Sequence, residues 1–130
     1  MARILVVDDD AEIVEMLRIL LSSAGYDVET ARDGNEAVDL LRGKATYDLM
    51  LLDVRMSPIN GVWLLSLSRE EHPDLPVIMV TAYDSREVAT QTLGMGAAAY
   101  VLKPFNTAKL LDLVASTIRE RRGGKGAAAG

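Results

Sequence analysis

Four short apolar runs constrain the fold of this chain more than any other feature of its sequence. Each is too short for a typical helix and is bounded by polar or turn residues; the runs are Ile4–Val7, Leu49–Leu52, Val77–Val80 and Ala99–Leu102. Continuous apolar runs of this length are typical of strands buried on both faces of a parallel sheet. A fifth segment, Asp27–Ala31, alternates polar and apolar residues and predicts a weaker strand at a sheet edge.

Helical patterns occupy the segments between these predicted strands. They combine apolar residues at helical spacing with capping residues at their ends, and the expected helices are Glu12–Ala24, 33–41, Gly61–Glu71, 84–93 and Ala108–Arg121. Strands and helices therefore alternate five times, which predicts a doubly wound α/β fold with helices on both faces of a five-stranded parallel sheet. Ligands of such folds bind at the carboxyl ends of the strands.

Length and composition indicate one ordinary globular domain. The chain has 130 residues, of which 49% are hydrophobic and 25% charged, and we expect the domain to occupy residues 1–122. The glycine- and alanine-rich residues 123–130 read as a flexible linker remnant or a tag. The chain has no cysteine, so disulfides and thiolate metal sites are excluded.

Charge and the amino-terminal sequence bear on partners and location. The formal net charge of −5 disfavours non-specific binding to nucleic acid or to anionic membranes. The first residues run directly into a predicted strand without the layout of a signal peptide. We therefore expect a cytoplasmic protein that itself binds neither nucleic acid nor membrane.

A polar residue of a particular kind follows each of the four apolar runs. The residues at these four strand ends are Asp8, Asp9 and Asp10, then Asp53, Thr81 and Lys103. Because the fold places the carboxyl ends of the strands side by side, carboxylates, a hydroxyl and an ammonium group should converge on one rim. Mg²⁺ accepts such oxygen ligands and keeps waters beside a phosphate, and a carboxylate can act as a nucleophile. The pattern therefore predicts a site for phosphoryl transfer.

Each of these residues also has an ordinary explanation when it is taken alone. Asp9 and Glu12 have the spacing of a helix capping box, Lys103 could be a surface lysine, and Thr81 could simply end a strand. Capping explains Asp53 poorly, because no polar residue precedes it from Leu49 onward. The four strand ends together favour a shared site.

The chain resembles a response-regulator receiver domain of two-component signalling systems, a family that includes stand-alone chemotaxis regulators. The matching stretches are Ile4–Asp10, Leu51–Met56, Val80–Ala82 and Lys103–Phe105, and the resemblance covers about residues 3–121. It implies a flavodoxin-like fold with strand order 2-1-3-4-5. It also implies a phosphorylation-activated switch that is not an enzyme beyond catalysing its own phosphorylation and dephosphorylation.

The resemblance assigns the acceptor and the metal ligands. Asp53 would accept a phosphoryl group from the phosphohistidine of a sensor histidine kinase. Mg²⁺ would bind Asp53, Asp9 directly, Asp8 mainly through water, and the backbone carbonyl of Arg55.

The same resemblance assigns the switch. Lys103 would pair with a phosphoryl oxygen, and with Asp53 before phosphorylation. Thr81 would bond the phosphoryl group and move inward with Tyr100, while Pro104 would follow a cis peptide bond. The fourth helix, fifth strand and fifth helix would then change their shared face and control an output domain, a partner protein or a homodimer.

The sequence departs from the family pattern at several positions. Ser57 replaces the usual proline, which comes next as Pro58, while Gly61 keeps its place, so we expect an altered loop path and an intact site. Ala98 and Ala99 precede Tyr100 where many DNA-binding members carry an acidic residue, which puts their dimer mode in doubt. Arg55 and Tyr83 occupy positions that tune self-dephosphorylation in the family, and their bulk should slow attack by water.

Three other functions fit the sequence less well. A Mg²⁺-dependent phosphatase with an aspartyl-phosphate intermediate, of the haloacid-dehalogenase type, needs an aspartate two residues after its nucleophile, and Arg55 stands there. A flavodoxin-like nucleotide or flavin module lacks a glycine-rich cradle and would have an acidic rim. A degenerate receiver that works without phosphorylation is disfavoured, because all five expected residue types of the site are present.

Overall fold

The computed structural model describes residues 2–56 and 59–129. Its strands are β1 (Arg3–Val7), β2 (Asp27–Ala31), β3 (Leu49–Leu52), β4 (Val77–Thr81) and β5 (Ala99–Leu102). Its helices are α1 (Ala11–Ser23), α2 (Gly34–Arg42), α3 (Gly61–Glu71), α4 (Arg86–Gly94) and α5 (Thr107–Ala129). All strand pairs are parallel, and the order is β2-β1-β3-β4-β5. The predicted α/β fold and strand order are therefore confirmed.

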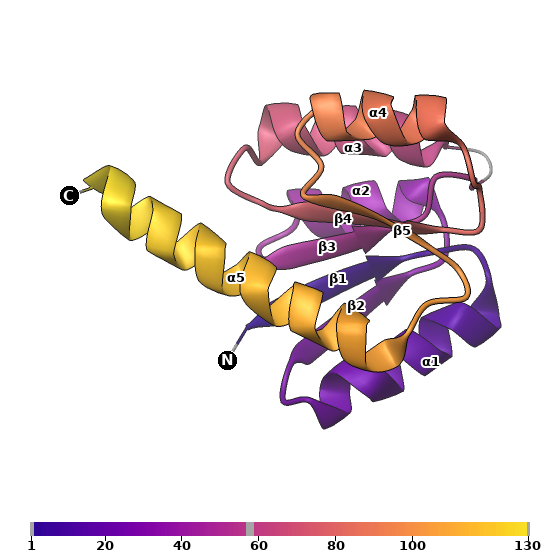
Figure 1. Cartoon of the computed structure of the whole chain (residues 1–130), viewed down its shortest axis with the longest axis horizontal. Coiled ribbons are helices and arrows are strands. Elements are labelled where there is room, and N and C mark those ends of the chain that lie inside the picture. Colours follow the sequence, from indigo (N-terminus) through magenta and orange to yellow (C-terminus); the bar gives the residue numbers. More distant parts are fainter. Residues whose placement is uncertain (1, 57–58, 130) are drawn as a thin grey trace.

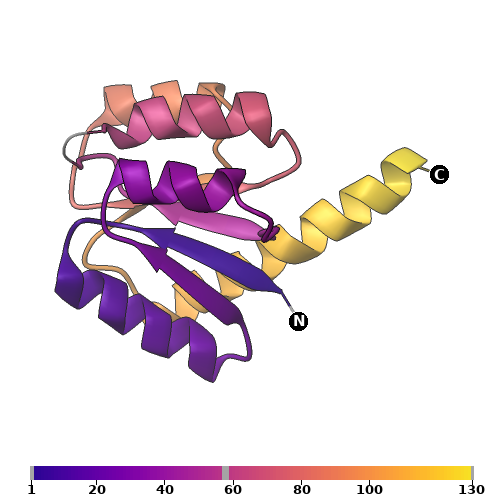
Figure 2. The same ribbon diagram turned by 180° about the vertical axis from the view of Figure 1, so that it is seen from behind.

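The sheet separates two hydrophobic layers. Figures 1 and 2 show α2, α3 and α4 on one face of the sheet and α1 and α5 on the other. Successive strand residues alternate between the two layers: Leu5 and Val7 face α2 and α3, whereas Ile4 and Val6 face α1 and α5. The inner strands β1, β3 and β4 are buried almost throughout, as expected for strands covered on both faces.

The two edge strands differ from each other in how well the sequence predicted them. β2 lies at one edge with alternating exposure, as predicted. β5 forms the other edge and is only half-buried, with Leu102 39% exposed. The expectation that Ala99–Leu102 is buried on both faces is therefore wrong, because this strand has a neighbour on one side only.

Helix caps refine the predicted boundaries. The Asp10 side chain, and not that of Asp9, accepts from the backbone N–H groups at the start of α1. Ser85 rather than Asp84 caps α4. The carboxylate of Asp9 is thereby left to face the strand ends, where the sequence predicts a metal ligand.

Helix α5 continues beyond its predicted end at Arg121 and runs to Ala129. Its last turns project beyond the sheet (Figures 1 and 2). Alanine favours helix, whereas each interior glycine disfavours it by about 1 kcal/mol. The domain boundary at residue 122 stays a prediction.

Within the described part of the chain, no helix has the length and apolar character required to cross a bilayer.

Candidate functional site

Backbone hydrogen bonds bring the strand ends together on one rim of the sheet. The N–H group of Asp53 donates to the carbonyl oxygen of Val7 at 3.0 Å, and that of Asp8 donates to Ala31 at 3.1 Å. On the other side, the N–H group of Lys103 donates to the carbonyl oxygen of Thr81 at 2.8 Å. These bonds continue the sheet pairing past the strand ends and fix the backbone positions from which the functional side chains extend.

Three carboxylates cluster on this rim. Asp8 and Asp53 are 2% and 7% exposed, whereas Asp9 is exposed to solvent. One carboxylate oxygen from each of the three residues lies within 4.8 Å of the others. Oxygen ligands at this spacing, two of them buried and one open to water, suit a hard divalent cation that keeps part of its hydration shell.

Lys103 is the cation of the cluster, and it pairs with two of the carboxylates. Its Nζ atom lies 2.5 Å from Oδ2 of Asp8 and 3.4 Å from Oδ2 of Asp53. The expected pairing with Asp53 is present, but the pairing with Asp8 is the shorter of the two. When all three carboxylates are ionised, they exceed the single ammonium by two negative charges, which a divalent cation would balance.

Burial decides the direction of the pKa shift of Asp8, whereas the neighbouring carboxylates decide that of Lys103. Burial raises the pKa of Asp8, more than the hydrogen bonds from Lys103 and from the Asp10 backbone lower it, and the charge of Asp53 raises it further. Burial alone would lower the pKa of Lys103, but the hydrogen bond and charge of Asp8, together with Asp53, raise it. The ammonium therefore stays charged, while the ionised form of Asp8 is disfavoured.

A hollow of about 180 Å³ opens beside the acceptor carboxylate, and its walls come from the end of β4 and from the segments after β3 and β4. Its lining residues are Asp53, Arg55, Thr81, Ala82 and Tyr83. Thr81 is almost fully buried, and its Oγ1 accepts from the N–H group of Tyr83 at 3.2 Å. A hydroxyl and a carboxylate thus border one small space, as the sequence predicts.

Two contacts made by tyrosines lie next to the hollow beside Asp53. The guanidinium carbon of Arg55 lies 3.7 Å from the centroid of the Tyr83 ring. The hydroxyl of Tyr100 donates to the carbonyl oxygen of Tyr83 at 2.5 Å, so the predicted switch residue lies half-buried against the site. The sequence singles out all three residues but carries no signal that Arg55 and Tyr83 stack.

The backbone on either side of the site is constrained. The N–H group of Gly61 donates to the carbonyl oxygen of Val54 at 2.8 Å, and a Cβ atom at Gly61 would lie 1.9 Å from the carbonyl oxygen of Asp53. Only glycine fits this approach.

The predicted cis peptide bond between Lys103 and Pro104 is present. The predicted change of path at Ser57 and Pro58 lies outside the described residues and stays a prediction.

Comparison with known proteins agrees with this arrangement. The response regulator receiver domain family matches residues 4–115. The transcriptional regulatory protein CpxR of Escherichia coli is 41% identical over 92% of this chain, and the response regulator protein PilR of Pseudomonas aeruginosa is 38% identical over 90%. The matched regions are 50% of CpxR and 26% of PilR, so the chain spans half or less of these relatives.

Solved structures support the same assignment. A CheY-like response regulator receiver domain protein from Methanospirillum hungatei superposes with a TM-score of 0.91 at 32% identity, covering 95% of this chain and 98% of that one. The Thermotoga maritima response regulator TrrA, in complex with Mg²⁺ and BeF, gives a TM-score of 0.80 at 36% identity, covering 90% and 99%. The fold, the strand-end residues and these relatives show that the chain belongs to the response regulator receiver domain family.

Proposed function

We propose that this chain is a phosphorylation-activated switch in which Asp53 accepts a phosphoryl group from the phosphohistidine of a sensor histidine kinase. The observation that carries the proposal is the grouping of Asp8, Asp9 and Asp53 within 4.8 Å, with Lys103 bridging two of them. Phosphoryl transfer depends mainly on positioning and on neutralising the charge of the transferred group, and this rim offers both.

Mg²⁺ is the metal that the donor set suits best. All the side-chain ligands are carboxylate oxygens, and Asp9 opens to solvent, so the ion can keep waters and accept a phosphoryl oxygen. The carbonyl of Arg55 is the proposed backbone ligand. Bound Mg²⁺ would neutralise charge that builds up between the carboxylates and the incoming phosphoryl group. Lys103 would pair with a second phosphoryl oxygen, and Thr81 would donate its hydroxyl hydrogen to a third.

The switch would pass from Thr81 through Tyr100 to the face formed by α4, β5 and α5. Phosphorylation adds charge and acceptor oxygens beside Thr81, and Tyr100 lies on the edge strand β5. Leu93 and Leu102 are exposed on this side of the molecule. A partner protein or an output domain that binds only one arrangement of this face would read the signal, and the greater length of CpxR and PilR fits an attached output domain.

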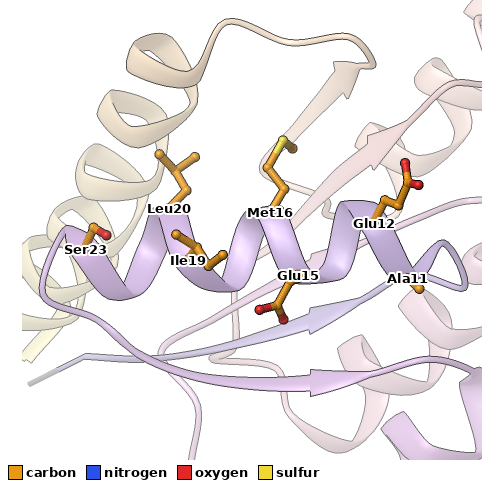
Figure 3. A pocket seen from close by; sticks show the side chains of 7 residues that line it. All are labelled: Ala11, Glu12, Glu15, Met16, Ile19, Leu20 and Ser23. Atoms are coloured by element: carbon orange, nitrogen blue, oxygen red, sulfur yellow. The ribbon is translucent and has the colours of Figure 1, made fainter.

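The exposed face of α1 is the proposed docking surface for the kinase. The side chains of Met16 and Leu20 project from one side of this helix, and Ile19 lies beside them (Figure 3). Ile19 is 53% exposed. Because α1 begins directly after the acidic strand end, a helix of the partner packed here would bring a phosphohistidine close to Asp53.

The proposal is tested with a phosphoryl mimic. Addition of beryllofluoride and Mg²⁺ should shift the amide resonances of the Asp53 rim and of β5 in an NMR spectrum, whereas Asp53→Asn should show neither shift. Acetyl phosphate should label the wild type stoichiometrically in the presence of Mg²⁺. A wild type that responds to neither reagent contradicts the proposal, and sustained turnover of small phosphate esters would favour the phosphatase instead.

A further inference from the structure

A hollow of about 340 Å³ lies at the rim of the sheet opposite Asp53. Its walls come from the end of α2 and the segment before β3, from the end of α3 and the segment before β4, and from Arg121 on α5. These segments lead into the amino ends of β3 and β4, the ends away from the arrowheads in Figure 1. The hollow is therefore separate from the phosphoryl-transfer rim, which lies at the carboxyl ends of the strands.

Two ion pairs hold the walls of this hollow in place. Arg42, at the end of α2, donates through Nε and Nη2 to the two carboxylate oxygens of Glu71, at the end of α3, at 3.1 and 2.7 Å. Nη1 of Arg121 donates to Oδ1 of Asp48 at 3.1 Å. The other oxygen of Asp48 accepts from the N–H group of Arg3 at 2.8 Å. Segments far apart in the sequence are thus tied together around one space.

Three covered polar atoms around the hollow have no hydrogen-bond partner in the described part of the chain. They are the hydroxyl of Tyr47, Nε2 of His72 and Nε of Arg121, and all three residues line the hollow. Tyr47 is only 7% exposed. Buried polar groups in native proteins almost always have a partner, and a missing one costs stability. Three such groups from three separate segments indicate a partner that binds between them.

The size and lining of the hollow indicate a small molecule with one ring. Its volume lies at the lower end of the range for small-molecule pockets, about 300–1,000 Å³. Apolar side chains line it beside the Tyr47 ring, among them Leu41, Ala45 and Leu75, and they suit a flat ring. Nε of Arg121 can only donate a hydrogen bond, so the ligand needs an acceptor on its edge. Small rotations of the covering side chains would accompany binding, as is common when partners bind.

The charges around the hollow favour a ligand without net charge. Among the lining side chains, Lys44 and Arg121 balance Glu71 and Asp74 at a pH where His72 is neutral. Helices α2 and α3 both end at this hollow, and the carboxyl end of a helix carries partial negative charge. These helix ends disfavour an anion, and the ammonium and guanidinium groups disfavour a cation.

We propose that this hollow binds an uncharged heteroaromatic molecule with a hydrogen-bond acceptor on its edge, held by Tyr47, His72 and Arg121. The proposal goes beyond the proposed phosphoryl transfer and does not depend on it. A ligand bound here would join the ends of α2 and α3 to α5, and it would stabilise the folded chain in proportion to its occupancy.

The test is an NMR titration of the whole chain with nicotinamide, an uncharged ring with a pyridine nitrogen and an amide. The amide resonances of Lys44–Tyr47, of His72–Leu75 and of Arg121 should shift and saturate, while that of Asp53 stays in place. The melting temperature should rise with nicotinamide concentration. Nicotinate, the same ring with a carboxylate, should bind about three- to thirtyfold more weakly, the effect of two helix ends on one charge.

Matched variants test the contacts. Tyr47→Phe removes only the hydroxyl, and Arg121→Lys keeps a charge opposite Asp48 but has no Nε–H group. Each should weaken nicotinamide binding about two- to tenfold, the range for loss of one hydrogen bond, and Tyr47→Phe should do so without lowering the melting temperature of the free protein. Tyr26→Phe removes a hydroxyl in the other hydrophobic layer and should bind like the wild type.

The outcomes keep this site apart from the phosphoryl-transfer rim. Asp53→Asn should bind nicotinamide like the wild type, whether or not Asp53 accepts a phosphoryl group. Shifts that do not saturate, or that scatter over the surface, overturn the proposal, because water then suffices as the partner of the three groups. Equal binding by wild type, Tyr47→Phe and Arg121→Lys also overturns it. Nicotinate that binds as tightly as nicotinamide would show that the ligand class is wrong.

Discussion

Replacement of Gly61 by alanine should damage both the fold and the site. The new Cβ atom would lie 1.9 Å from the carbonyl oxygen of Asp53 and 2.8 Å from its carbonyl carbon, whereas real Cβ contacts stay above 3.0 Å. The clash is with backbone, so no side chain can rotate away. The start of α3 and the segment that follows β3 must instead move apart by about 1 Å, enough to strain or break the 2.8 Å bond from Gly61 to Val54.

The cost can be worked out from these contacts. Overpacking of this kind costs about 1–3 kcal/mol, and the lost hydrogen bond adds about 1 kcal/mol. The higher helix propensity of alanine returns at most about 1 kcal/mol. We expect the free energy of unfolding to fall by about 1–4 kcal/mol, a large part of the ~5–15 kcal/mol of a typical domain. Urea titration followed by circular dichroism measures it.

Gly94→Ala is the matched control, because a Cβ atom added to this helical glycine would meet nothing within 4 Å. It should raise the free energy of unfolding by up to about 1 kcal/mol. A Gly61→Ala variant as stable as the wild type would refute the close approach on which the placement of Asp53 depends. Because the clash displaces the Asp53 backbone, the concentration of Mg²⁺ needed for the beryllofluoride response should also rise.

Three further changes test other parts of the structure. Asp8→Asn in a chelating buffer should raise the free energy of unfolding at pH 7, because the raised pKa of Asp8 means that its ionised form opposes folding. In urea titrations, this gain in the free energy of unfolding should shrink as the pH falls toward 3.8. A loss of stability that does not depend on pH would contradict the prediction. Tyr47→Phe should be neutral or stabilising by about 1 kcal/mol, since the buried Tyr47 hydroxyl has no hydrogen-bond partner among the described residues. Burial, and secondarily Glu29, also raise the pKa of Tyr47, so wild type should lose stability as the pH rises above 10 and the variant should lose less. Ile19→Lys should slow phosphotransfer from a purified partner kinase at least tenfold yet leave labelling by acetyl phosphate unchanged; equal slowing of both would place the defect at Asp53 and not at α1.

The sheet and the strand-end residues were predictable from sequence because both follow from local pattern and topology. A run such as Leu49–Leu52 can be recognised in isolation, and parallel order then places Asp53 beside Asp8. The burial of β5 was not predictable from its composition, since Ala99–Leu102 is as apolar as an inner strand and only its edge position exposes it.

Contacts between side chains were harder to predict than positions. Asp9 and Asp10 both have residue types and spacings that suit a cap, and backbone geometry decides for Asp10. Lys103 could pair with either buried carboxylate, and a separation of 2.5 against 3.4 Å from the two depends on rotamers that no sequence pattern encodes. The Arg55–Tyr83 stack likewise requires two loops to be fixed before either side chain has a neighbour.

The short contact between Lys103 and Asp8 makes metal entry an exchange of counterions. A divalent cation that binds Asp8 competes with the ammonium already there, so the free energy of breaking that ion pair is subtracted from the metal affinity. By the same linkage, a bound metal would weaken the hold of Asp8 on the end of β5, the strand that leads directly into Lys103 and carries Tyr100 three residues earlier. In the proposed switch, metal concentration would therefore act on the same strand as the phosphoryl group, before any phosphoryl group arrives.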